Sequence, residues 1–482
     1  MDRSYWQTRG HRTSETPMVM RCSDDIPRSA LIVGRRRTSI LLSTLLATSL
    51  FGCGADKPGD AASENLGTQH RLIIKCGAMI DGESDAALGP HLISISDGVI
   101  ASIAPLTGQL SPVSQLDLSD YTCLPGLINT HVHFDANPED AADYGVYARR
   151  SSSDNLKLIL DNAETTLRTG FTTVRHVGAW FPDTLATAKS LIDDGLAPGP
   201  SIQTAGPYLT IPGGGGDLTF PEIPPEAIPV ESQQGIATTP EEFALRAEAA
   251  IDKGAEFLKV IASGAVFSVG TNPGAPEMNQ DDIEAVVAVA KAHGIKVTAH
   301  VHSDQSGRDA ILAGVDSLEH ASLLSDETIR LAVERGVALS MDVYNGTYTD
   351  TTGRELGYPE VFIERNLATT EAQRQVFEKA LVAGATLLYG TDGGVLPHDM
   401  GGWQFGIMVE RGMTPMQAIR SATSVAADHM GLGDSVGALR EGLNADIIAV
   451  PDNPLTNIDT LRTVPIVIKD GQLVKGPIKH LE

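Results

Sequence analysis

The sequence GLINTHVHF at residues 126–134 has the character of a short buried β-strand that ends in two histidines. Seven more short apolar runs follow it, separated mostly by amphipathic helical segments: FTTVRHV (171–177), SIQTAG (201–206), FLKVIAS (257–263), KVTAHV (296–301), SLEHAS (317–322), VALSMDV (337–343) and TLLYGTDGG (386–394). Alternation of strands with helices predicts a parallel α/β sheet, and eight such units are typical of a TIM (β/α)8 barrel. We therefore expect an α/β fold with the barrel at residues 126–432.

One long segment interrupts this alternation. Residues 209–238 are rich in glycine and proline and include four consecutive glycines at 213–216. Long irregular segments in compact domains are usually functional or mobile. Because the segment follows the third strand, we expect it to lie over the C-terminal face of the barrel.

The two ends of the body have a different texture. Short alternating strands separated by Asp-Gly and Pro-Gly turns occupy residues 70–125, and the same pattern returns at 433–482. This pattern favours short antiparallel strands. We predict that both ends pair into one small β-sandwich domain beside the barrel.

The first 69 residues are typical of an export signal and a linker. Three arginines at 35–37 precede an apolar run at 38–52, which is shorter than the roughly 20 residues that a membrane-spanning helix needs. Leu50-Phe51-Gly52-Cys53 resembles a bacterial lipobox, although an ordinary signal cleaved elsewhere is the alternative. We predict a signal peptide at 1–52, a flexible tether at 53–69, and a periplasmic or cell-envelope protein anchored by lipid on Cys53.

Charge and cysteine content restrict the partners. The chain carries a net charge of −25, and because residues 1–52 are basic, the remainder is more acidic still. Such a body repels phosphate backbones, so we expect no nucleic-acid partner. Cys76 and Cys123 remain for the body, where they either pair in an oxidising compartment or serve as small core residues.

Five candidate metal ligands fall at the ends of predicted barrel strands. His131 and His133 are two residues apart on one strand, so their side chains point to the same side. His300, His320 and Asp392 end three other strands. A lone His-x-His pair is a weak signal, but ligands that share the C-terminal rim of a barrel occupy the place where such folds carry their active sites.

Lys259 ends the fourth predicted strand among apolar neighbours. An ammonium group has three donors and no lone pair, so it cannot bind a cation and is costly to bury. Taken alone, this residue is most simply a salt-bridged core lysine.

The motifs together resemble the amidohydrolase superfamily over residues 71–476. The matching stretches are LPGLINTHVHF, TGFTTVRHVGA, GAEFLKVIASG, VTAHVHS, GVDSLEHAS, LLYGTDGGV and MTPMQAIRSATSVAA. In members with this pattern the lysine of the fourth strand is carboxylated by CO₂ and bridges two metals. The resemblance thus implies one ion on His131, His133 and Asp392, a second on His300 and His320, and carboxylated Lys259 between them. Two divalent ions are expected, with zinc favoured by the ligand set and manganese or iron left open.

The resemblance also implies catalytic roles. A metal-activated hydroxide attacks the carbonyl, and Asp392 takes its proton and returns it to the leaving amine. His302, two residues past His300, is a candidate catalytic and substrate-binding residue, with a solvated loop histidine as the alternative. His398 and Tyr208 are further candidate substrate contacts.

The nearest branch of the superfamily is that of Xaa-Pro dipeptidases and related carboxypeptidases, with ochratoxin-hydrolysing enzymes. This sequence departs from it at two places: glycines at 213–216 replace a GGHG motif, and Arg175-His176-Val177-Gly178 replaces RDVG. The first change removes an imidazole and leaves room for a bulky acyl group.

Three functions remain open. We expect an amidohydrolase acting on dipeptides or N-acyl amino acids, including bulky aryl-acyl compounds of the ochratoxin type. The alternatives are a cyclic amide or lactone hydrolase like imidazolonepropionase, and a lipid-anchored binding protein without turnover. The partner is a small amide or peptide in the first case, and a homo-oligomer is left open.

Overall fold

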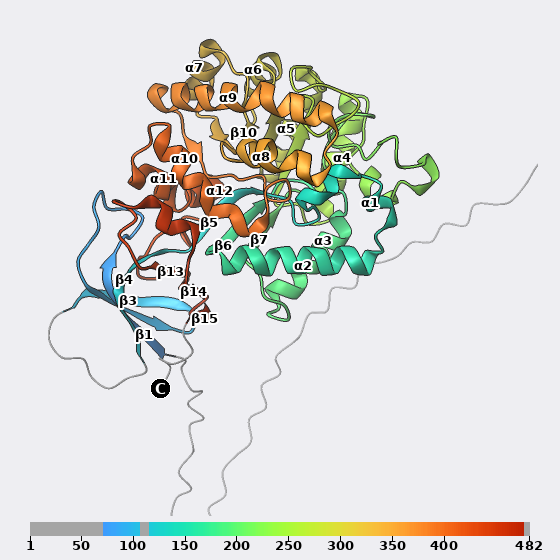
Figure 1. Cartoon of the computed structure of the whole chain (residues 1–482). Coiled ribbons are helices and arrows are strands. Elements are labelled where there is room, and N and C mark those ends of the chain that lie inside the picture. The colour runs from blue at the N-terminus through green and yellow to red at the C-terminus, as the bar shows by residue number, and fades with distance from the viewer. Residues whose placement is uncertain (1–70, 107–114, 477–482) are drawn as a thin grey trace, which may run out of the picture. The chain divides into compact units, whose positions relative to one another are not determined.

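The computed structural model describes residues 71–106 and 115–476 (Figure 1). The predicted signal peptide and tether lie outside these residues, and the predicted domain boundaries stay predictions. Among the described residues, no helix is both long and apolar enough to cross a membrane.

Eight parallel strands form the centre of the fold. Three make one sheet, in the order β5 (Leu127–Val132), β6 (Phe171–His176) and β7 (Ser201–Thr204). Five make a second, in the order β12 (Leu387–Leu388), β11 (Ala338–Ser340), β10 (Ser317–His320), β9 (Lys296–Val301) and β8 (Phe257–Ile261). These strands coincide with the eight predicted ones.

Isolated contacts link the edges of the two sheets. Leu209 forms a parallel bridge to Val260 beside β8, and Val132 forms one to Gly393 beyond β12. The arrangement is of the TIM-barrel type, although the continuous strand ladders do not join into one closed sheet. The predicted TIM-barrel type of fold is therefore found, but with two strand sheets that are linked only by isolated bridges.

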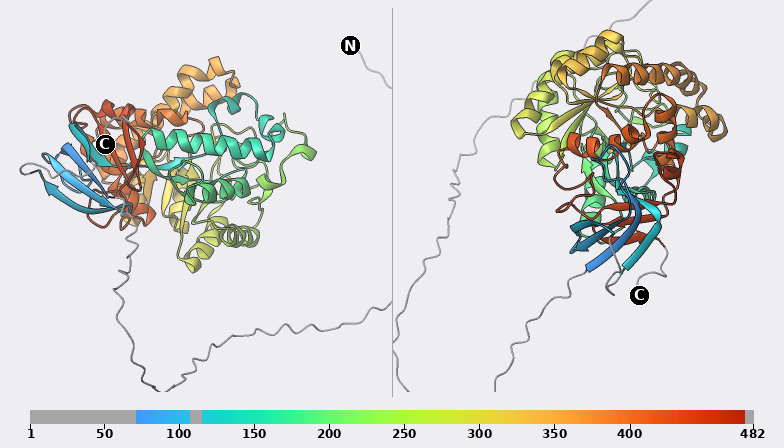
Figure 2. Two further views of the ribbon diagram at one scale, coloured as in Figure 1. Left: turned by 90° about the horizontal axis from the view of Figure 1, so that it is seen from below. Right: turned by 90° about the vertical axis from the view of Figure 1, so that its left-hand side faces the viewer.

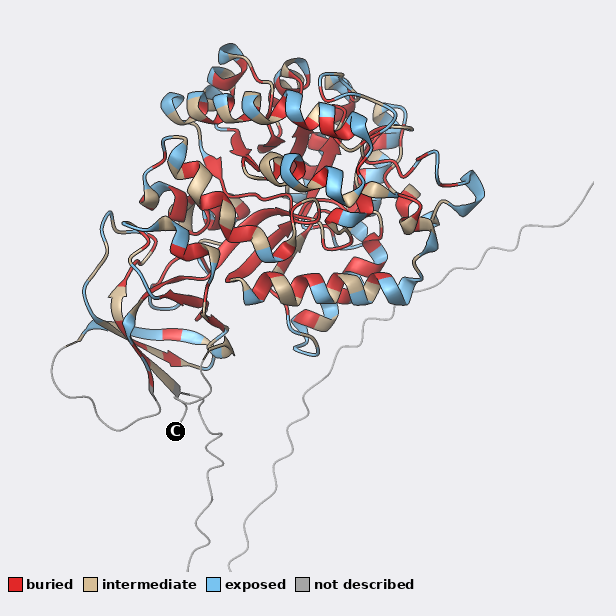
Figure 3. Cartoon of the chain, viewed as in Figure 1, coloured by how far each residue is buried: buried red, intermediate tan, exposed pale blue. Residues whose placement is uncertain are grey.

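Helices cover the outside of these strands. The longer ones are α2 (Ser152–Arg168), α3 (Pro182–Asp193), α4 (Pro240–Asp252), α5 (Gln280–His293), α6 (Asp304–Ala313), α7 (Asp326–Arg335), α8 (Asn345–Leu356) and α9 (Glu360–Ala383). Shorter ones are α1 (Val146–Arg149), α10 (Gln404–Glu410), α11 (Pro415–Ser421) and α12 (Ser424–Met430). Figure 3 shows the central strands buried and the helices exposed on their outer faces. This is why the strands read as continuous apolar runs rather than as alternating ones.

Local sequence sets the helix ends. The Asn279 side chain accepts a hydrogen bond from the backbone N–H of Asp282 and so caps α5, which ends at Gly294 in the left-handed conformation. Ser325 caps α7 in the same way, and Gly336 ends it. Such caps satisfy backbone groups that the helix leaves unpaired. Each helix therefore ends close to its neighbouring strand, which fixes where that strand begins.

The two ends of the body pair into one sheet. Its order is β15 (Gln472–Lys475), β14 (Ile466–Lys469), β13 (Ile447–Val450), β4 (Gln115–Pro125), β1 (Arg71–Met79), β2 (His91–Ser96) and β3 (Val99–Pro105). In both views of Figure 2 the blue first strands lie beside the red last ones. The predicted pairing of the ends is confirmed, but the predicted β-sandwich is not, because the described strands make a single seven-stranded sheet.

Cys76 on β1 and Cys123 on β4 form a disulfide, with 5.9 Å between their Cα atoms. Both are fully buried in the apolar cluster of this sheet. The open question between a disulfide and two small core residues is thus resolved in favour of the disulfide.

Candidate active site

A cavity opens where the barrel strands end, and all six predicted metal ligands line it. His131 and His133 come from the end of β5, Lys259 from β8, His300 from β9, His320 from β10 and Asp392 from the turn after β12. His320 and Asp392 have φ angles of 65° and 55°, a backbone region that side chains other than glycine rarely adopt. Such strained residues are concentrated at functional sites.

Three lone-pair atoms meet on one side of the cavity. Nε2 of His131 lies 3.3 Å from Nε2 of His133 and 3.3 Å from Oδ1 of Asp392. Nε2 of His133 lies 3.5 Å from the same oxygen. Burial and the charge of Lys259 lower the pKa of His131, but Asp392 and Glu319 raise it more, so that its pKa lies above the ordinary value. Burial lowers the pKa of the neighbouring His133 to about 3, so this ring is neutral at pH 7 and is a suitable ligand for a cation beside the Asp392 carboxylate.

In three of these histidines the second ring nitrogen, Nδ1, already has a hydrogen-bond partner. Nδ1 of His131 lies 2.7 Å from a Glu319 oxygen, and Nδ1 of His320 lies 3.0 Å from Asp342. Nδ1 of His133 lies 3.0 Å from the carbonyl oxygen of Gly178. These acceptors draw the N–H to Nδ1 and leave the lone pair on Nε2, the tautomer of a histidine that ligates through Nε2.

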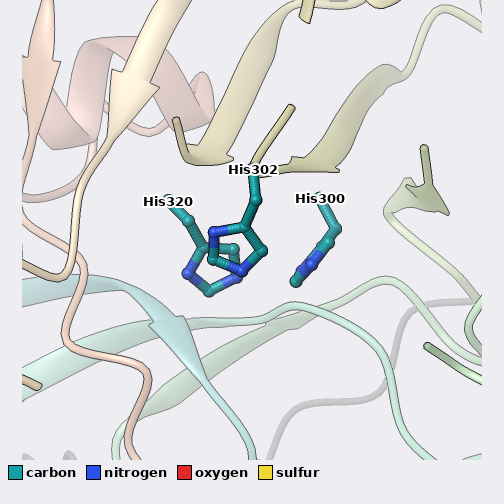
Figure 4. Close-up of side chains that lie close together, drawn as sticks. All are labelled: His300, His302 and His320. Atoms are coloured by element: carbon teal, nitrogen blue, oxygen red, sulfur yellow. The ribbon is translucent and has the colours of Figure 1, made fainter. Parts of the chain in front are cut away.

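A second group consists of His300, His302 and His320 (Figure 4). The ring centroids of His300 and His320 are 4.5 Å apart, and those of His302 and His320 are 4.8 Å apart. Nε2 of His300 is buried and has no hydrogen-bond partner within the described part of the chain. Burial lowers the pKa of His302 to about 3 and that of His300 well below its ordinary value, so both are neutral at pH 7. Neutral imidazoles and carboxylates are suitable ligands for divalent cations.

Lys259 lies among these groups and is 1% exposed. Within residues 71–106 and 115–476 its ammonium makes no hydrogen bond or ion pair, which contradicts the simple reading as a salt-bridged core lysine. Burial lowers its pKa to about 8, so its neutral amine form is accessible near neutral pH.

The comparison with known sequences agrees with this geometry. The pattern of the Amidohydrolase family matches residues 122–474 of this chain. The chain belongs to the amidohydrolase family. It is accordingly a metal-dependent hydrolase of carbon–nitrogen bonds.

Relatives define the branch of this amidohydrolase. Ochratoxinase of Aspergillus niger is 30% identical over 429 residues, which cover 84% of this chain and 87% of the relative. The crystal structure of an Xaa-Pro dipeptidase with bound methionine matches with a TM-score of 0.79 and 31% identity, over 84% of this chain and all of the other. Imidazolonepropionase of Haloarcula marismortui is 24% identical over 452 residues, 84% of this chain and 94% of the relative. The predicted superfamily and its ochratoxinase-like and dipeptidase-like branch are thereby confirmed.

Two of the three predicted substrate contacts of the amidohydrolase line the cavity. Nδ1 of His302 lies 2.8 Å from the Ser322 hydroxyl. The Tyr208 hydroxyl lies 2.9 Å from Nδ1 of His133. His398 is placed elsewhere: its ring packs on Phe134, with nitrogens 3.4 Å from Thr166 Oγ1 and 3.4 Å from the carbonyl of Ala136. The structure therefore gives no support to His398 as a substrate contact.

The two departures from the branch pattern have different positions. Of the four glycines at 213–216, Gly215 lines the cavity, and its backbone N–H donates to Glu277 at 3.0 Å. The expected place of this segment over the barrel's C-terminal end is therefore correct for Gly215. His176 is fully buried behind His133, and its Nε2 accepts a hydrogen bond of 2.8 Å from the backbone N–H of Phe134.

Sequence reasoning missed the polar residues that hold the predicted ligands. Glu319 and Arg175 form a fully buried ion pair of 2.5 Å beneath His131, and Asp342 holds His320. The available signal was the presence of opposite charges, Arg175 and Glu319, inside two strands whose other residues are buried. Asn345, which contacts Asp392, had no comparable signal.

Proposed function

We propose that this amidohydrolase cleaves N-acyl amino acids or dipeptides and accepts a bulky aromatic acyl group. The observation that carries the proposal is an aromatic wall on the cavity that holds the candidate ligands. Its members are Tyr144, Tyr147, Trp180, Tyr208 and Phe267. Tyr144 also stacks on Phe220, with 3.8 Å between ring centroids. Aromatic walls favour flat apolar groups, and the similarity to ochratoxinase supports the same choice.

The proposal includes two zinc ions and a carboxylated Lys259. His131, His133 and Asp392 would hold one ion, His300 and His320 the other, and the carbamate of Lys259 would contact both. Divalent ions in this position supply an activated water and polarise the scissile carbonyl. The lowered pKa of Lys259 supports carboxylation, because only a neutral amine reacts with CO₂.

Asp392 is the proposed general acid and base. Its Oδ1 faces the two Nε2 atoms of His131 and His133, and its Oδ2 accepts a hydrogen bond of 3.1 Å from Asn345. Burial raises the pKa of Asp392, but its neighbours His131, His320 and His133 lower it more, so that it rests as a carboxylate. It can therefore take the proton of the attacking water and pass it to the leaving nitrogen.

His302 is the proposed polar contact for a substrate oxygen. When the Ser322 hydroxyl donates to Nδ1 of His302, the ring carries its proton on Nε2 and can donate it to a carbonyl or carboxylate. The neutral ring is consistent with this role, because the burial that lowers its pKa also keeps water from competing.

A substrate screen with zinc-loaded enzyme tests the proposal. The panel contains dipeptides, benzoyl and naphthoyl amino acids, and cyclic amides and lactones. Turnover of aryl-acyl amino acids with release of the free amino acid is expected. Asp392→Asn should lower kcat by about 10²-fold to 10⁴-fold, the usual cost of removing a general acid or base. Turnover confined to the cyclic compounds contradicts the proposal.

The cyclic amide or lactone hydrolase remains the second candidate because of the similarity to imidazolonepropionase. In such a substrate the leaving nitrogen stays tethered to the acyl carbon. The aromatic wall offers no particular advantage to a small polar ring, which is why the aryl-acyl substrate is preferred here.

A further inference from the structure

The side-chain amide of Asn345 has one end engaged and one end without a partner. Asn345 is the first residue of α8, is 6% exposed and lines the cavity. Its Nδ2 lies 3.1 Å from Oδ2 of Asp392 and 3.2 Å from Oδ2 of Asp342. Ionised carboxylates only accept hydrogen bonds, so the atom between them must be the NH₂ group. The orientation of the amide is thereby fixed.

The oxygen of the same amide consequently points away from both acids. Oδ1 of Asn345 is buried and has no hydrogen-bond partner among residues 71–106 and 115–476. A buried polar atom without a partner is unfavourable and rare in folded proteins. Because Asn345 lines the cavity, a bound substrate can supply the hydrogen-bond donor that Oδ1 lacks.

The proposed chemistry identifies which donor this is. Asp392 must come within hydrogen-bond distance of the scissile nitrogen in order to protonate it. Asn345 lies against Asp392 through its Nδ2, so Oδ1 of the same amide is the unpaired acceptor nearest along this side chain to a nitrogen held at Asp392. The scissile nitrogen of a secondary amide carries one hydrogen, which is directed at a neighbouring acceptor.

We propose that Oδ1 of Asn345 accepts the hydrogen bond of the scissile N–H and thereby selects secondary amides. N-alkylated amides, such as the bond before proline, have no hydrogen on this nitrogen, and esters present an oxygen that would face Oδ1 with a lone pair. This inference rests on the proposed function, since it needs the scissile nitrogen next to Asp392.

The contact should act on the rate as well as on binding. As the amine leaves, its nitrogen gains a proton from Asp392 and becomes more positive, while its bond to the acyl carbon breaks. A neutral amide oxygen next to this nitrogen interacts more strongly with it in the transition state than in the substrate. The nitrogen of Asn345 meanwhile holds Asp392 and Asp342 in place.

Three matched substrates test the proposal: N-benzoyl-L-phenylalanine, its N-methyl derivative, and the ester with oxygen in place of the nitrogen. The variants are Asn345→Ala and Asn345→Leu, the second of which keeps side-chain volume. Gln373→Ala is the control, because Gln373 donates to Asp342 at 2.7 Å but does not contact Asp392. Circular dichroism and metal content verify the fold of each variant.

The expected result is a change in selectivity. Both Asn345 variants should lose at least about tenfold more kcat/KM on the secondary amide than on the ester, as expected when one hydrogen bond is lost. Gln373→Ala should affect all three substrates by the same factor. Equal losses on amide and ester would mean that Asn345 acts only by positioning Asp392, which overturns the proposal.

The wild-type enzyme gives an independent answer if the variants do not fold. It should cleave the secondary amide faster than the N-methyl derivative by a factor larger than that of their alkaline hydrolysis. Equal or reversed preference overturns the inference while leaving the proposed function intact. Failure to cleave the secondary amide at all overturns the proposed function itself.

Discussion

Glu319 joins Arg175 to His131 in a buried chain of contacts. One carboxylate oxygen of Glu319 lies 2.7 Å from Nδ1 of His131, and the other lies 2.5 Å from the Arg175 guanidinium. Burial alone would raise the pKa of Glu319. The charge of Arg175 and the contact with His131 lower it by more, so that the pKa lies well below its ordinary value. A carboxylate bonded to Nδ1 makes Nε2 of His131 a better metal ligand.

Replacing Glu319 should therefore weaken metal binding. We expect Glu319→Gln to lower metal affinity by about 10-fold to 100-fold, the usual effect of removing such a partner. Competition with a chelator, followed by metal analysis, measures this directly. Glu277→Gln is the matched control, since Glu277 is half-buried and contacts Gly215 rather than a candidate ligand. Unchanged affinity in Glu319→Gln would show that Arg175 and Glu319 serve the fold alone.

Lys259→Ala should lose metal and activity together. A carboxylated Lys259 would contact both ions, so its removal leaves each ion short of one ligand. A short carboxylic acid such as propionate, added in excess, should restore part of both. Lys296→Ala is the control, because Lys296 lies at the start of β9 and donates to the carbonyl of His429, outside the cavity. Normal metal content and turnover in Lys259→Ala would refute the two-metal bridge.

The placement of the candidate ligands could be predicted because barrel strands have a common register. A histidine or aspartate at the end of each of several parallel strands must lie at the same rim, whatever the helices between them do. The partners of those ligands could not be predicted in the same way. Glu319 on β10 and Arg175 on β6 are 144 residues apart in the sequence, and only the arrangement of the two sheets around a common centre brings them together.

Two predictions show the limits of sequence patterns. Alternating residues define the two faces of a strand but not the number of sheets, so the pattern predicts a sandwich where the described strands form one seven-stranded sheet. His398 follows the last barrel strand, but the chain turns there into the 3-10 helix His398–Trp403, which directs the imidazole against Phe134. The closeness of His398 to Asp392 in the sequence does not indicate this turn.

Reduction of the disulfide should destabilise the protein. The bond between Cys76 and Cys123 closes a loop with a sequence separation of 47 residues, and such a link typically contributes about 2–4 kcal/mol. Denaturant unfolding with and without a reducing agent should show a lower midpoint after reduction. The double variant Cys76→Ala/Cys123→Ala should be less stable and insensitive to the reducing agent. An unchanged midpoint in the wild-type protein would exclude a stabilising role.

Attachment of lipid to Cys53 stays a prediction, because this residue lies outside the described part of the chain. Expression of the full gene in a bacterium should place the protein in the membrane fraction. Cys53→Ser should release it as a soluble protein with unchanged activity, while Cys22→Ser should not. A wild-type protein found wholly in the soluble fraction would refute the anchor.

Gly215→His should change the choice of acyl group. Gly215 lines the cavity, and a Cβ atom at this position would lie 3.2 Å from Cβ of Ala265 and 3.3 Å from Cγ2 of Ile261. Both contacts are tight and Gly215 lines the cavity, so we expect the imidazole to extend into the space proposed for the acyl group. We expect kcat/KM for naphthoyl-phenylalanine to fall by at least about tenfold relative to that for alanyl-phenylalanine, equivalent to about 1.4 kcal/mol of lost transition-state binding. Gly274→His is the control, because a Cβ atom there meets open space and Gly274 is not part of the cavity wall. If Gly215→His instead favoured the naphthoyl substrate, the all-glycine segment could not be what admits a bulky acyl group.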